Sequence, residues 1–229
     1  MKNDVRITNF VNGASADVID YKLYYVIINE GGGSFPTQVD STFVAYKGWD
    51  LENEVFDQNN QGIWFTYPQT SAIDPISISG FRQIVTKIKT PANITENTST
   101  GAVTYSNYGT ALVFIPSGLA YFSGSIGGKS YNPIAFQVKL YNKKLNDQDR
   151  DRVKSIYEDI NGNGNFFDDD TDGDNIPDFL DVDDDGDGVV TKTEIRASAS
   201  GVLPTTYYDF NDIPLCNGTK KKHLDPACR

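Results

Sequence analysis

The feature that most constrains this 229-residue chain is a run of 38 residues, 159–196, in which acidic side chains recur at alternate positions. The run holds twelve aspartates and one glutamate against one lysine and one arginine, so its net charge of −11 equals that of the whole chain. The remainder is therefore neutral. Clustered acids repel phosphates, which argues against nucleic acid as a partner. Such a segment either stays disordered or is neutralised by something positive.

The spacing of the acids favours bound cations. Asp183, Asp185 and Asp187 stand at positions 1, 3 and 5 of an EF-hand loop pattern, Gly188 at position 6 and Glu194 at position 12. Oxygen ligands without His or Cys suit Ca²⁺ better than Zn²⁺. Two further loops overlap in series before this one, beginning at residues 159 and 170. We therefore predict several structural calcium ions, held by Asp159, Asn161, Asn163, Asp170, Asp172, Asp174, Asp178, Asp181, Asp183, Asp185, Asp187, Val189 (through its carbonyl) and Glu194.

A weaker form of the pattern lies just upstream, with acids at positions 1, 3, 5 and 12: Asp147, Asp149, Asp151 and Glu158. Arg152 replaces the loop glycine, and Lys154 replaces the apolar residue at position 8. A connecting helix over 145–158 is therefore predicted there instead.

Residues 21–144 are rich in β-branched and aromatic residues with interspersed Gly and Pro, which is typical of strands and turns. Strands are predicted over 21–29, 42–49, 111–115 and 134–142. A helical spacing relates Phe81, Ile84, Val85 and Ile88, with Ser79 as a possible N-cap. A short helix among strands predicts an α+β arrangement in which the sheet folds over the helix. The stretch between Lys89 and Gly109 is predicted to be a surface loop with room for a small hairpin.

Composition divides the chain into five segments. They are an N-terminal lead-in (1–20), the β-rich domain (21–144), the connecting helix (145–158), the acidic calcium-binding repeats (159–196), which form an irregular segment, and a C-terminal tail (197–229). The tail holds Cys216 and Cys228, which form either a small disulfide loop in an oxidising compartment or two exposed thiols. His223 lies in the basic stretch KKKHLDP and is expected to be exposed.

Four blocks in order resemble FKBP-type peptidyl-prolyl isomerases. They are YKLYYVIINEGGGSFPTQVDSTFVAYKGWDLENEVFD at 21–57, ISGF at 78–81, IPSGLAYF at 115–122 and PIAFQVKL at 133–140. The resemblance implies an antiparallel sheet curled around one short helix and an aromatic pocket for a prolyl residue. Carried over by position, the pocket residues are Tyr46, Phe56, Asp57, Phe65, Ile78, Phe81, Tyr121 and Phe136.

The resemblance also implies roles within this pocket. Phe81 would form the floor, the Ile78 N–H would bind the substrate carbonyl, and the Tyr121 hydroxyl would add a second hydrogen bond. Trp64 competes with Phe65, because the spacing permits either. Phe122 stands where the family has Gly, which is a departure at the rim of the pocket.

The acidic segment DTDGDNIPDFLDVDDDGDGV resembles the calcium-binding repeats of thrombospondin type 3 modules. An FKBP-like domain followed by such repeats resembles cell-envelope lipoproteins of some bacteria. The expected location is therefore periplasmic or cell-surface, with a lipid anchor on a native N-terminus that this chain lacks. No apolar stretch approaches the roughly 20 residues of a membrane span.

Three functions follow from these features. The first is an exported peptidyl-prolyl cis–trans isomerase that acts on proline-containing polypeptide segments and carries a calcium-stabilised extension. The second is a non-catalytic module that only binds such segments. The third is a calcium-dependent surface spacer or adhesion protein.

Overall fold

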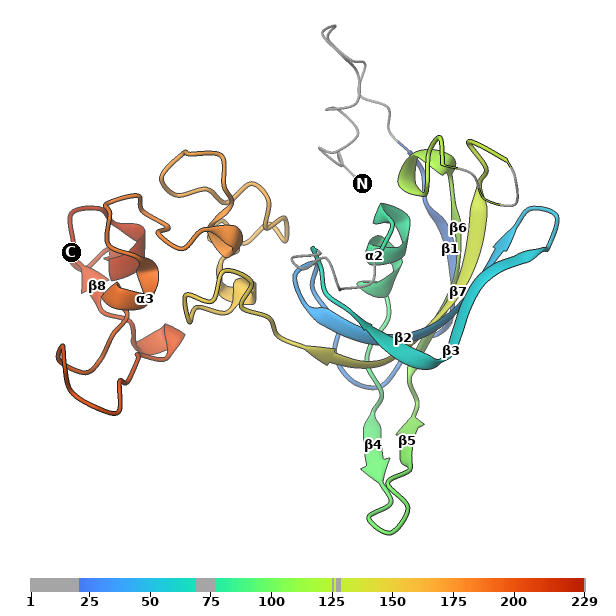
Figure 1. Ribbon diagram of the computed structural model, residues 1–229, viewed down its shortest axis with the longest axis horizontal. Helices are drawn as coiled ribbons and strands as arrows, with labels where there is room; N and C mark the ends of the chain where they lie inside the picture. The colour runs from blue at the N-terminus through green and yellow to red at the C-terminus, as the bar shows by residue number, and fades with distance from the viewer. Residues whose placement is uncertain (1–20, 69–76, 125, 127–128, 229) are drawn as a thin grey trace, which may run out of the picture. The chain divides into compact units, whose positions relative to one another are not determined.

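The structure, a computed structural model, describes residues 21–68, 77–124, 126 and 129–228 (Figure 1). The predicted lead-in, 1–20, lies outside the described residues. The described chain forms two compact units. The first comprises residues 21–36 and 41–144, and the second comprises residues 37–40 and 145–228.

The first unit is built on a five-stranded antiparallel sheet with the strand order β1–β6–β7–β2–β3. Its strands are β1 (Tyr24–Asn29), β2 (Ser41–Asp50), β3 (Val55–Phe65), β6 (Gly109–Ile115) and β7 (Ile134–Lys144). A hairpin of β4 (Asn93–Glu96) and β5 (Val103–Ser106) extends beyond one end of this sheet (Figure 1).

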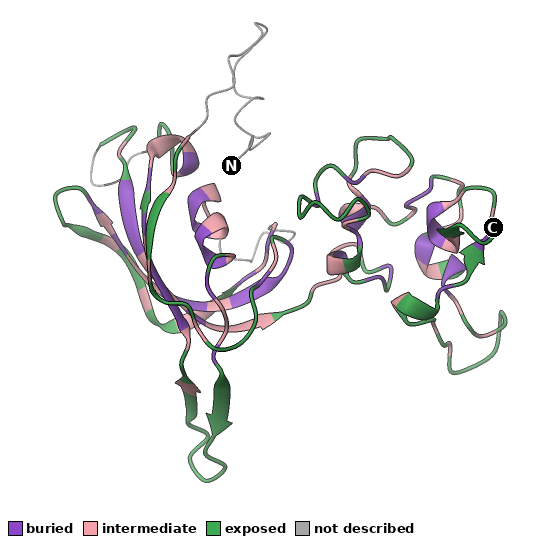
Figure 2. Cartoon of the chain, turned by 180° about the vertical axis from the view of Figure 1, so that it is seen from behind, coloured by how far each residue is buried: buried purple, intermediate pink, exposed green. Residues whose placement is uncertain are grey.

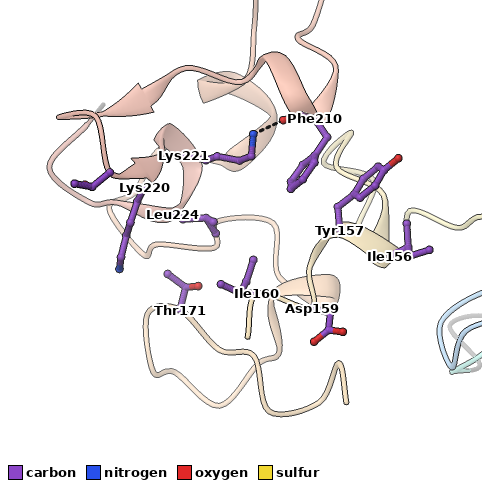
Figure 3. Close-up of a pocket in the computed structure, with 10 residues that line it drawn as sticks. Ile156, Tyr157, Asp159, Ile160, Thr171, Phe210, Lys220, Lys221 and Leu224 are labelled. Carbon is purple, nitrogen blue, oxygen red and sulfur yellow. Dashed lines mark hydrogen bonds between the residues drawn. The ribbon is translucent and has the colours of Figure 1, made fainter. Parts of the chain in front are cut away.

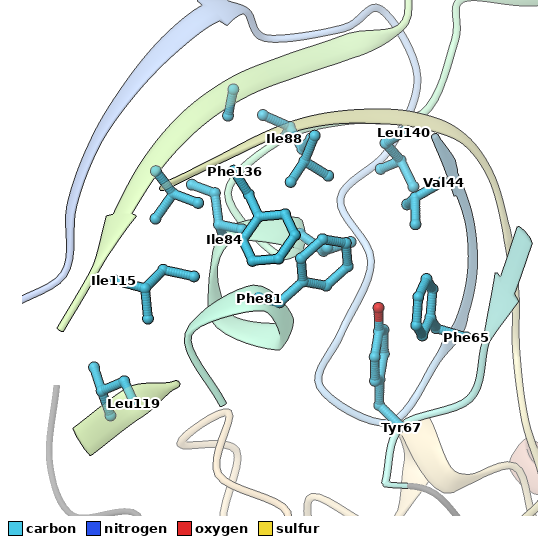
Figure 4. Close-up of a cluster of buried hydrophobic side chains, with 14 of the residues drawn as sticks. Val44, Phe65, Tyr67, Phe81, Ile84, Ile88, Ile115, Leu119, Phe136 and Leu140 are labelled. Carbon is cyan, nitrogen blue, oxygen red and sulfur yellow. The ribbon is translucent and has the colours of Figure 1, made fainter. Parts of the chain in front are cut away.

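One short helix, α2 (Ser79–Val85), lies in the hollow of the curled sheet (Figure 1). The α+β fold class is confirmed. Buried residues lie in the helix and the central strands (Figure 2), and Phe81 and Ile84 pack against Ile115 and Phe136 in one apolar core (Figure 4). The predicted cap is wrong. The extended Ile78 is the N-cap residue, and its carbonyl accepts hydrogen bonds from the Phe81 and Arg82 N–H groups.

Strand β3 (Val55–Phe65) was not predicted, because its centre, DQNNQG, lacks the alternation of a half-buried strand. Pairing with β2 along its length forms the strand nevertheless. Asn59 Oδ1 accepts hydrogen bonds from the Gln61 and Gly62 N–H groups (3.1 and 2.9 Å), beside an irregularity in the register with β2 between Val44 and Tyr46. Gly62 has a φ of +98°, which a β-branched residue would adopt only under strain.

The second unit contains little regular structure. Its elements are η2 (Ser155–Tyr157), η3 (Asp178–Leu180), α3 (Thr191–Glu194), η4 (Phe210–Asp212), β8 (Leu215–Cys216), β9 (Lys220–Lys221) and η5 (Lys222–Leu224). Two small apolar clusters hold it together, one around Phe179 and one around Ile195. Cys216 and Cys228 are joined in a disulfide.

The predicted helix over 145–158 is wrong. Of this segment only Ser155–Tyr157 is helical, and it is a single 3-10 turn. The carboxylates of Asp149 and Asp151 accept hydrogen bonds from the N–H groups of Asp151 (3.2 Å) and Val153 (2.7 Å). Such local bonds offer the backbone an alternative to the helix.

No helix among the described residues has the length and apolar character that crossing a membrane requires.

Candidate functional site

A small pocket opens beside the N-terminal end of α2. It is lined by Tyr46, Asp57, Phe65, Ser77, Ile78, Phe81, Tyr121 and Phe136. The structure thus brings together seven of the eight predicted pocket residues from five separate parts of the first unit. Ser77 was missed, because it precedes the block ISGF that carried the resemblance.

Four aromatic rings form the wall and floor of this pocket. The centroids of Tyr46, Phe65 and Phe136 lie 5.6, 5.3 and 5.4 Å from that of Phe81. Most of these contacts are tilted or edge-on, which is the favourable geometry for aromatic pairs. Phe81 and Phe136 are each 3% exposed, so they are core side chains as well as pocket walls. The floor is therefore rigid and apolar.

The phenol hydroxyls of Tyr46 and Tyr121 and the carboxylate of Asp57 lie at the polar edge of the pocket, which also includes Ser77. The Tyr46 hydroxyl donates a hydrogen bond to Asp57 Oδ2 over 3.0 Å. Burial and this carboxylate raise the pKa of Tyr46 to about 12. Burial, followed by the charge of Asp57, also raises the pKa of Tyr121. Both phenols are therefore neutral donors at physiological pH.

The eighth predicted residue, Phe56, stands behind the pocket. Its ring packs edge-on against Phe136 (5.4 Å) and Tyr121 (6.3 Å). Phe65 lines the pocket, whereas its neighbour Trp64 lies on the opposite face of β3 against Phe43 (5.4 Å) and is 41% exposed.

Neither Phe122 nor the 89–109 segment fills the pocket. Phe122 has a φ of +51° and packs edge-on against Tyr131 (5.2 Å), with 44% of its surface exposed. None of the lining residues comes from the β4–β5 hairpin. The enclosed space is nevertheless only about 30 Å³, which is room for about one or two water molecules. A group as large as a five-membered ring would fit only if a rim side chain such as Tyr121, which is 40% exposed, turned outward.

The acidic segment folds into consecutive loops with a common geometry. The residues at loop position 6 are Gly164, Asn175 and Gly188, and their φ angles are +78°, +76° and +88°. In each loop the N–H of this residue donates to the carboxylate at position 1 over 2.9–3.0 Å. The three loops therefore share one backbone turn.

Two groups of predicted ligands converge. One carboxylate oxygen from each of Asp170, Asp172 and Asp174 lies within 4.8 Å of the others, and Asp183, Asp185 and Asp187 do the same. Glu194 is 4% exposed, and its two carboxylate oxygens have no hydrogen-bond partner. Burial and repulsion from Asp185 and Asp187 raise its pKa to about 8.

Other predicted ligands are engaged within the protein. The side-chain amides of Asn161 and Asn163 donate to Asp168, a residue that was not predicted, and these bonds lower its pKa. Asp178 accepts hydrogen bonds from the N–H (2.7 Å) and hydroxyl (2.8 Å) of Thr171. Asp159 Oδ2 and Asp181 Oδ1 accept backbone N–H groups at 2.9 and 3.0 Å. Sequence spacing alone does not reveal these internal hydrogen bonds.

A third group of carboxylates, called the junction cluster below, consists of Asp149, Asp151, Glu158 and Asp184. The first three belong to the upstream pattern that was set aside in favour of a helix. Arg152, at loop position 6, has a φ of +89°, which matches Gly164, Asn175 and Gly188 of the other loops. The four loops are therefore alike in backbone, although the sequence identifies only three.

His223 is 1% exposed, so its predicted exposure is wrong. Helix η5 turns His223 and Leu224 inward, and the imidazole lies 6.5 Å from the ring of Phe210. Burial, with a further contribution from Lys221, lowers the pKa of His223 to about 4. The prediction failed because the lysines that precede His223 indicated an exposed, basic segment.

The second unit also has a wider hollow of about 500 Å³ (Figure 3). The rings of Tyr157 and Phe210 stack at one side with centroids 4.5 Å apart, and Lys221 donates a hydrogen bond to the Phe210 carbonyl (Figure 3). Ile160 and Leu224 continue the apolar lining (Figure 3).

The chain is similar to known proteins over part of its length. A family model described as BamM C-terminal matches residues 148–223. No curated protein matches the sequence.

Among solved structures, a peptidyl-prolyl cis–trans isomerase from Pseudomonas syringae pv. tomato is 20% identical, with a TM-score of 0.40 over 53% of this chain and 75% of its own. FkpA from Escherichia coli is 20% identical, with a TM-score of 0.40 over 61% of this chain and 56% of its own. The N-terminal domain of FKBP42 from Arabidopsis thaliana is 19% identical, with a TM-score of 0.41 over 58% of this chain and 94% of its own.

Proposed function

We propose that the first unit is a peptidyl-prolyl cis–trans isomerase of the FKBP type. The observation that carries the proposal is the ring-lined pocket, in which Tyr46, Phe65 and Phe136 surround Phe81 with Asp57 at the edge. The four sequence blocks that resemble the FKBP family supply the residues of this pocket. The substrates would be proline-containing segments of other polypeptides.

The proposed catalysis needs no nucleophile. Rotation about an X–Pro bond faces a barrier of about 18–20 kcal/mol, because resonance gives the C–N bond partial double-bond character. The planar amide carries separated charge, which an apolar pocket stabilises poorly. The twisted amide has lost this charge separation, so the ring-lined pocket favours it over the planar form. Selective stabilisation of the twisted form is what lowers the barrier.

Two hydrogen-bond donors would orient the twisted amide. The Ile78 N–H, at the start of α2, would bind the carbonyl of the residue before proline. The Tyr121 hydroxyl forms no hydrogen bond with the described residues, and it would turn outward on binding and supply the second bond. Tyr46, by contrast, is committed to Asp57 and holds that carboxylate at the pocket edge.

A matched pair of substitutions on β3 tests the pocket. Phe65→Leu removes a ring that lines it, whereas Trp64→Leu removes a ring from the opposite face of the same strand. Isomerisation of a proline-containing tetrapeptide, followed by NMR exchange, should slow at least about tenfold in Phe65→Leu and remain near wild type in Trp64→Leu. Equal rates in both variants would contradict the proposal. Binding of the tetrapeptide without exchange would favour the non-catalytic module.

We also propose that the loops of the second unit bind structural calcium ions. Asp183, Asp185 and Asp187, with the unpartnered Glu194, form the most complete ligand set among the predicted loops. Ca²⁺ accepts six to eight oxygen ligands from carboxylates, carbonyls and water. Calorimetric titration of the full chain with CaCl₂ tests this, and the absence of binding heat would contradict it. Loss of ligand binding on chelation, together with loss of order in the acidic segment, would favour the spacer or adhesion function.

Export to the cell envelope completes the proposal. The Cys216–Cys228 disulfide suits an oxidising compartment. Calcium loops of modest affinity also suit compartments in which calcium is abundant. Mass spectrometry of protein purified from the envelope fraction of the native cells, with and without reduction, would test both the location and the bridge.

A further inference from the structure

We infer that the junction cluster is a calcium site of its own, which joins the first loop of the second unit to the last. Asp184 lies 26 residues beyond Glu158 in the sequence, yet one carboxylate oxygen of each member lies within 4.8 Å of one from every other member. This inference extends the calcium binding proposed above and is independent of the isomerase.

Burial separates this cluster from an ordinary acidic surface. Glu158 and Asp184 are each 1% exposed, and both carboxylate oxygens of each have no hydrogen-bond partner. Asp149 Oδ2 and Asp151 Oδ2 are also buried and unpartnered. Six buried oxygens of the cluster therefore lack a donor, and four of them, one from each residue, converge. A buried carboxylate without a partner costs several kcal/mol, so the arrangement calls for a cation.

No cation of the protein supplies the missing charge within the described chain. The nearby Lys154 pairs with Asp147 at 3.7 Å. The Arg152 guanidinium lies over the ring of Tyr207, 5.1 Å from its centroid. Burial, and after it mutual repulsion, raises the pKa of Glu158 and Asp184. The charge is therefore balanced either by protons or by a metal ion.

The chemistry of the cluster selects calcium. Oxygens bound to one Ca²⁺ at 2.3–2.6 Å lie at most about 5 Å apart, which agrees with the spacing of this cluster. Six carboxylate oxygens fit the coordination number of Ca²⁺, whereas Mg²⁺ usually keeps several waters. The ligand set lacks the His and Cys that Zn²⁺ prefers.

The test compares ion stoichiometry in variants of the full chain by equilibrium dialysis against ⁴⁵Ca²⁺. Glu158→Gln should lose one bound ion, or bind it about tenfold or more weakly. Glu96→Gln, the same change at an exposed position of β4, should bind as wild type does. Asp185→Asn, in the last loop, should lose a different ion. Asp149→Asn replaces Glu158→Gln if that variant does not fold.

The free energy of unfolding, measured with and without calcium, gives a second readout that a purely structural role of Glu158 would not produce. Glu158→Gln removes one of four mutually repelling carboxylates, so it should stabilise the protein in chelator and destabilise it in saturating calcium. Wild-type stoichiometry in both Glu158→Gln and Asp149→Asn, with one ion lost in Asp185→Asn, would overturn the junction site and leave the loop sites intact. No calcium binding by the wild type would overturn both.

Discussion

The close approach of two rings to the backbone of β2 makes Gly48→Ala a sensitive test of the pocket. Gly48 pairs with Phe136 on β7 and with Asp57 on β3. A Cβ added at Gly48 would lie 2.6 Å from Phe136 Cε1 and 2.9 Å from Phe56 Cζ. Carbon atoms in favourable contact are about 3.5–4.0 Å apart, so the Phe136 ring would have to move by about 1 Å.

The cost of this movement can be bounded. Phe136 is 3% exposed and is held by Phe81, Tyr46 and Phe56, so it cannot shift without displacing another ring. Overpacking a dense core costs about 1–3 kcal/mol. With a urea dependence of about 1.5 kcal/mol per molar, a cost of 2 kcal/mol lowers the unfolding midpoint by about 1 M urea.

Tryptophan fluorescence can follow this unfolding, because both tryptophans of the chain, Trp49 and Trp64, lie in the first unit. The same sample should show slower isomerisation of the proline tetrapeptide, because the displaced Phe136 ring narrows the pocket. In a Phe136→Leu background the clash is relieved, so Gly48→Ala should cost at least about 1 kcal/mol less there. An equal cost in both backgrounds would refute the argument from ring contact.

Four further substitutions each test one interaction outside the contact at Gly48. Tyr46→Phe removes a hydrogen bond to an exposed carboxylate and should lower the free energy of unfolding by less than about 1 kcal/mol in urea titrations. His223→Gln should reduce the pH dependence of the free energy of unfolding of the calcium-loaded protein. The imidazole binds a proton near pH 6.5 in the unfolded state and only near pH 4 in the folded state. Lowering the pH through this window therefore destabilises the wild type by at most about 3 kcal/mol. Replacing Cys216 and Cys228 together by Ser should destabilise the second unit by up to about 3 kcal/mol, measurable by hydrogen exchange. Gly188→Ala forces an alanine to a φ of +88° and should cost about 1 kcal/mol and weaken calcium binding in calorimetry. A loss above about 1 kcal/mol in Tyr46→Phe, or unchanged values in the other three variants, would contradict the contact concerned.

Much of the first unit could be predicted from its sequence, because its core strands carry runs of apolar residues bounded by turns. Strands β6 and β7 and helix α2 lie where the pattern placed them, within a few residues. Strand β3 could not be found in this way, because it is an edge strand with a polar centre that pairs on one side only. Its stability comes from pairing with β2, and a local sequence pattern contains no information about that pairing.

The pocket illustrates a second limit. Alternation along β3 places Trp64 and Phe65 on opposite faces, but it does not decide which of the two faces the helix. That choice depends on the register with β2, which shifts by an irregularity between Val44 and Tyr46. Thr42 pairs with Phe65 and Phe43 pairs with Trp64, so Phe65 lies on the face of Thr42; a slip of one residue would exchange the two faces of β3 and place Trp64 there.

The upstream acidic loop shows how a sound local argument fails. Arg152 is unfavourable at a φ of +89°, so the sequence favoured a helix over a loop. The surrounding contacts override this preference. The Asn146 and Gln148 side-chain amides donate to the Val39 carbonyl at 2.9 and 2.7 Å, and Val153 is buried beside Ile195. Tertiary contacts of this kind can offset the one or two kcal/mol of strain at a single residue.

The two units therefore differ in what occupies their buried positions. In the first unit, rings such as Phe81 and Phe136 are at once the apolar core and the pocket, so the proposed site is as rigid as the fold. In the second unit the apolar clusters are small, and the fully buried positions include acids such as Glu158 and Asp184. Their burial opposes folding unless the charge is compensated, so the calcium binding that we propose would make folding and ion binding one equilibrium. The free energy of unfolding of the second unit should accordingly rise with the logarithm of the calcium concentration, while that of the first unit should not.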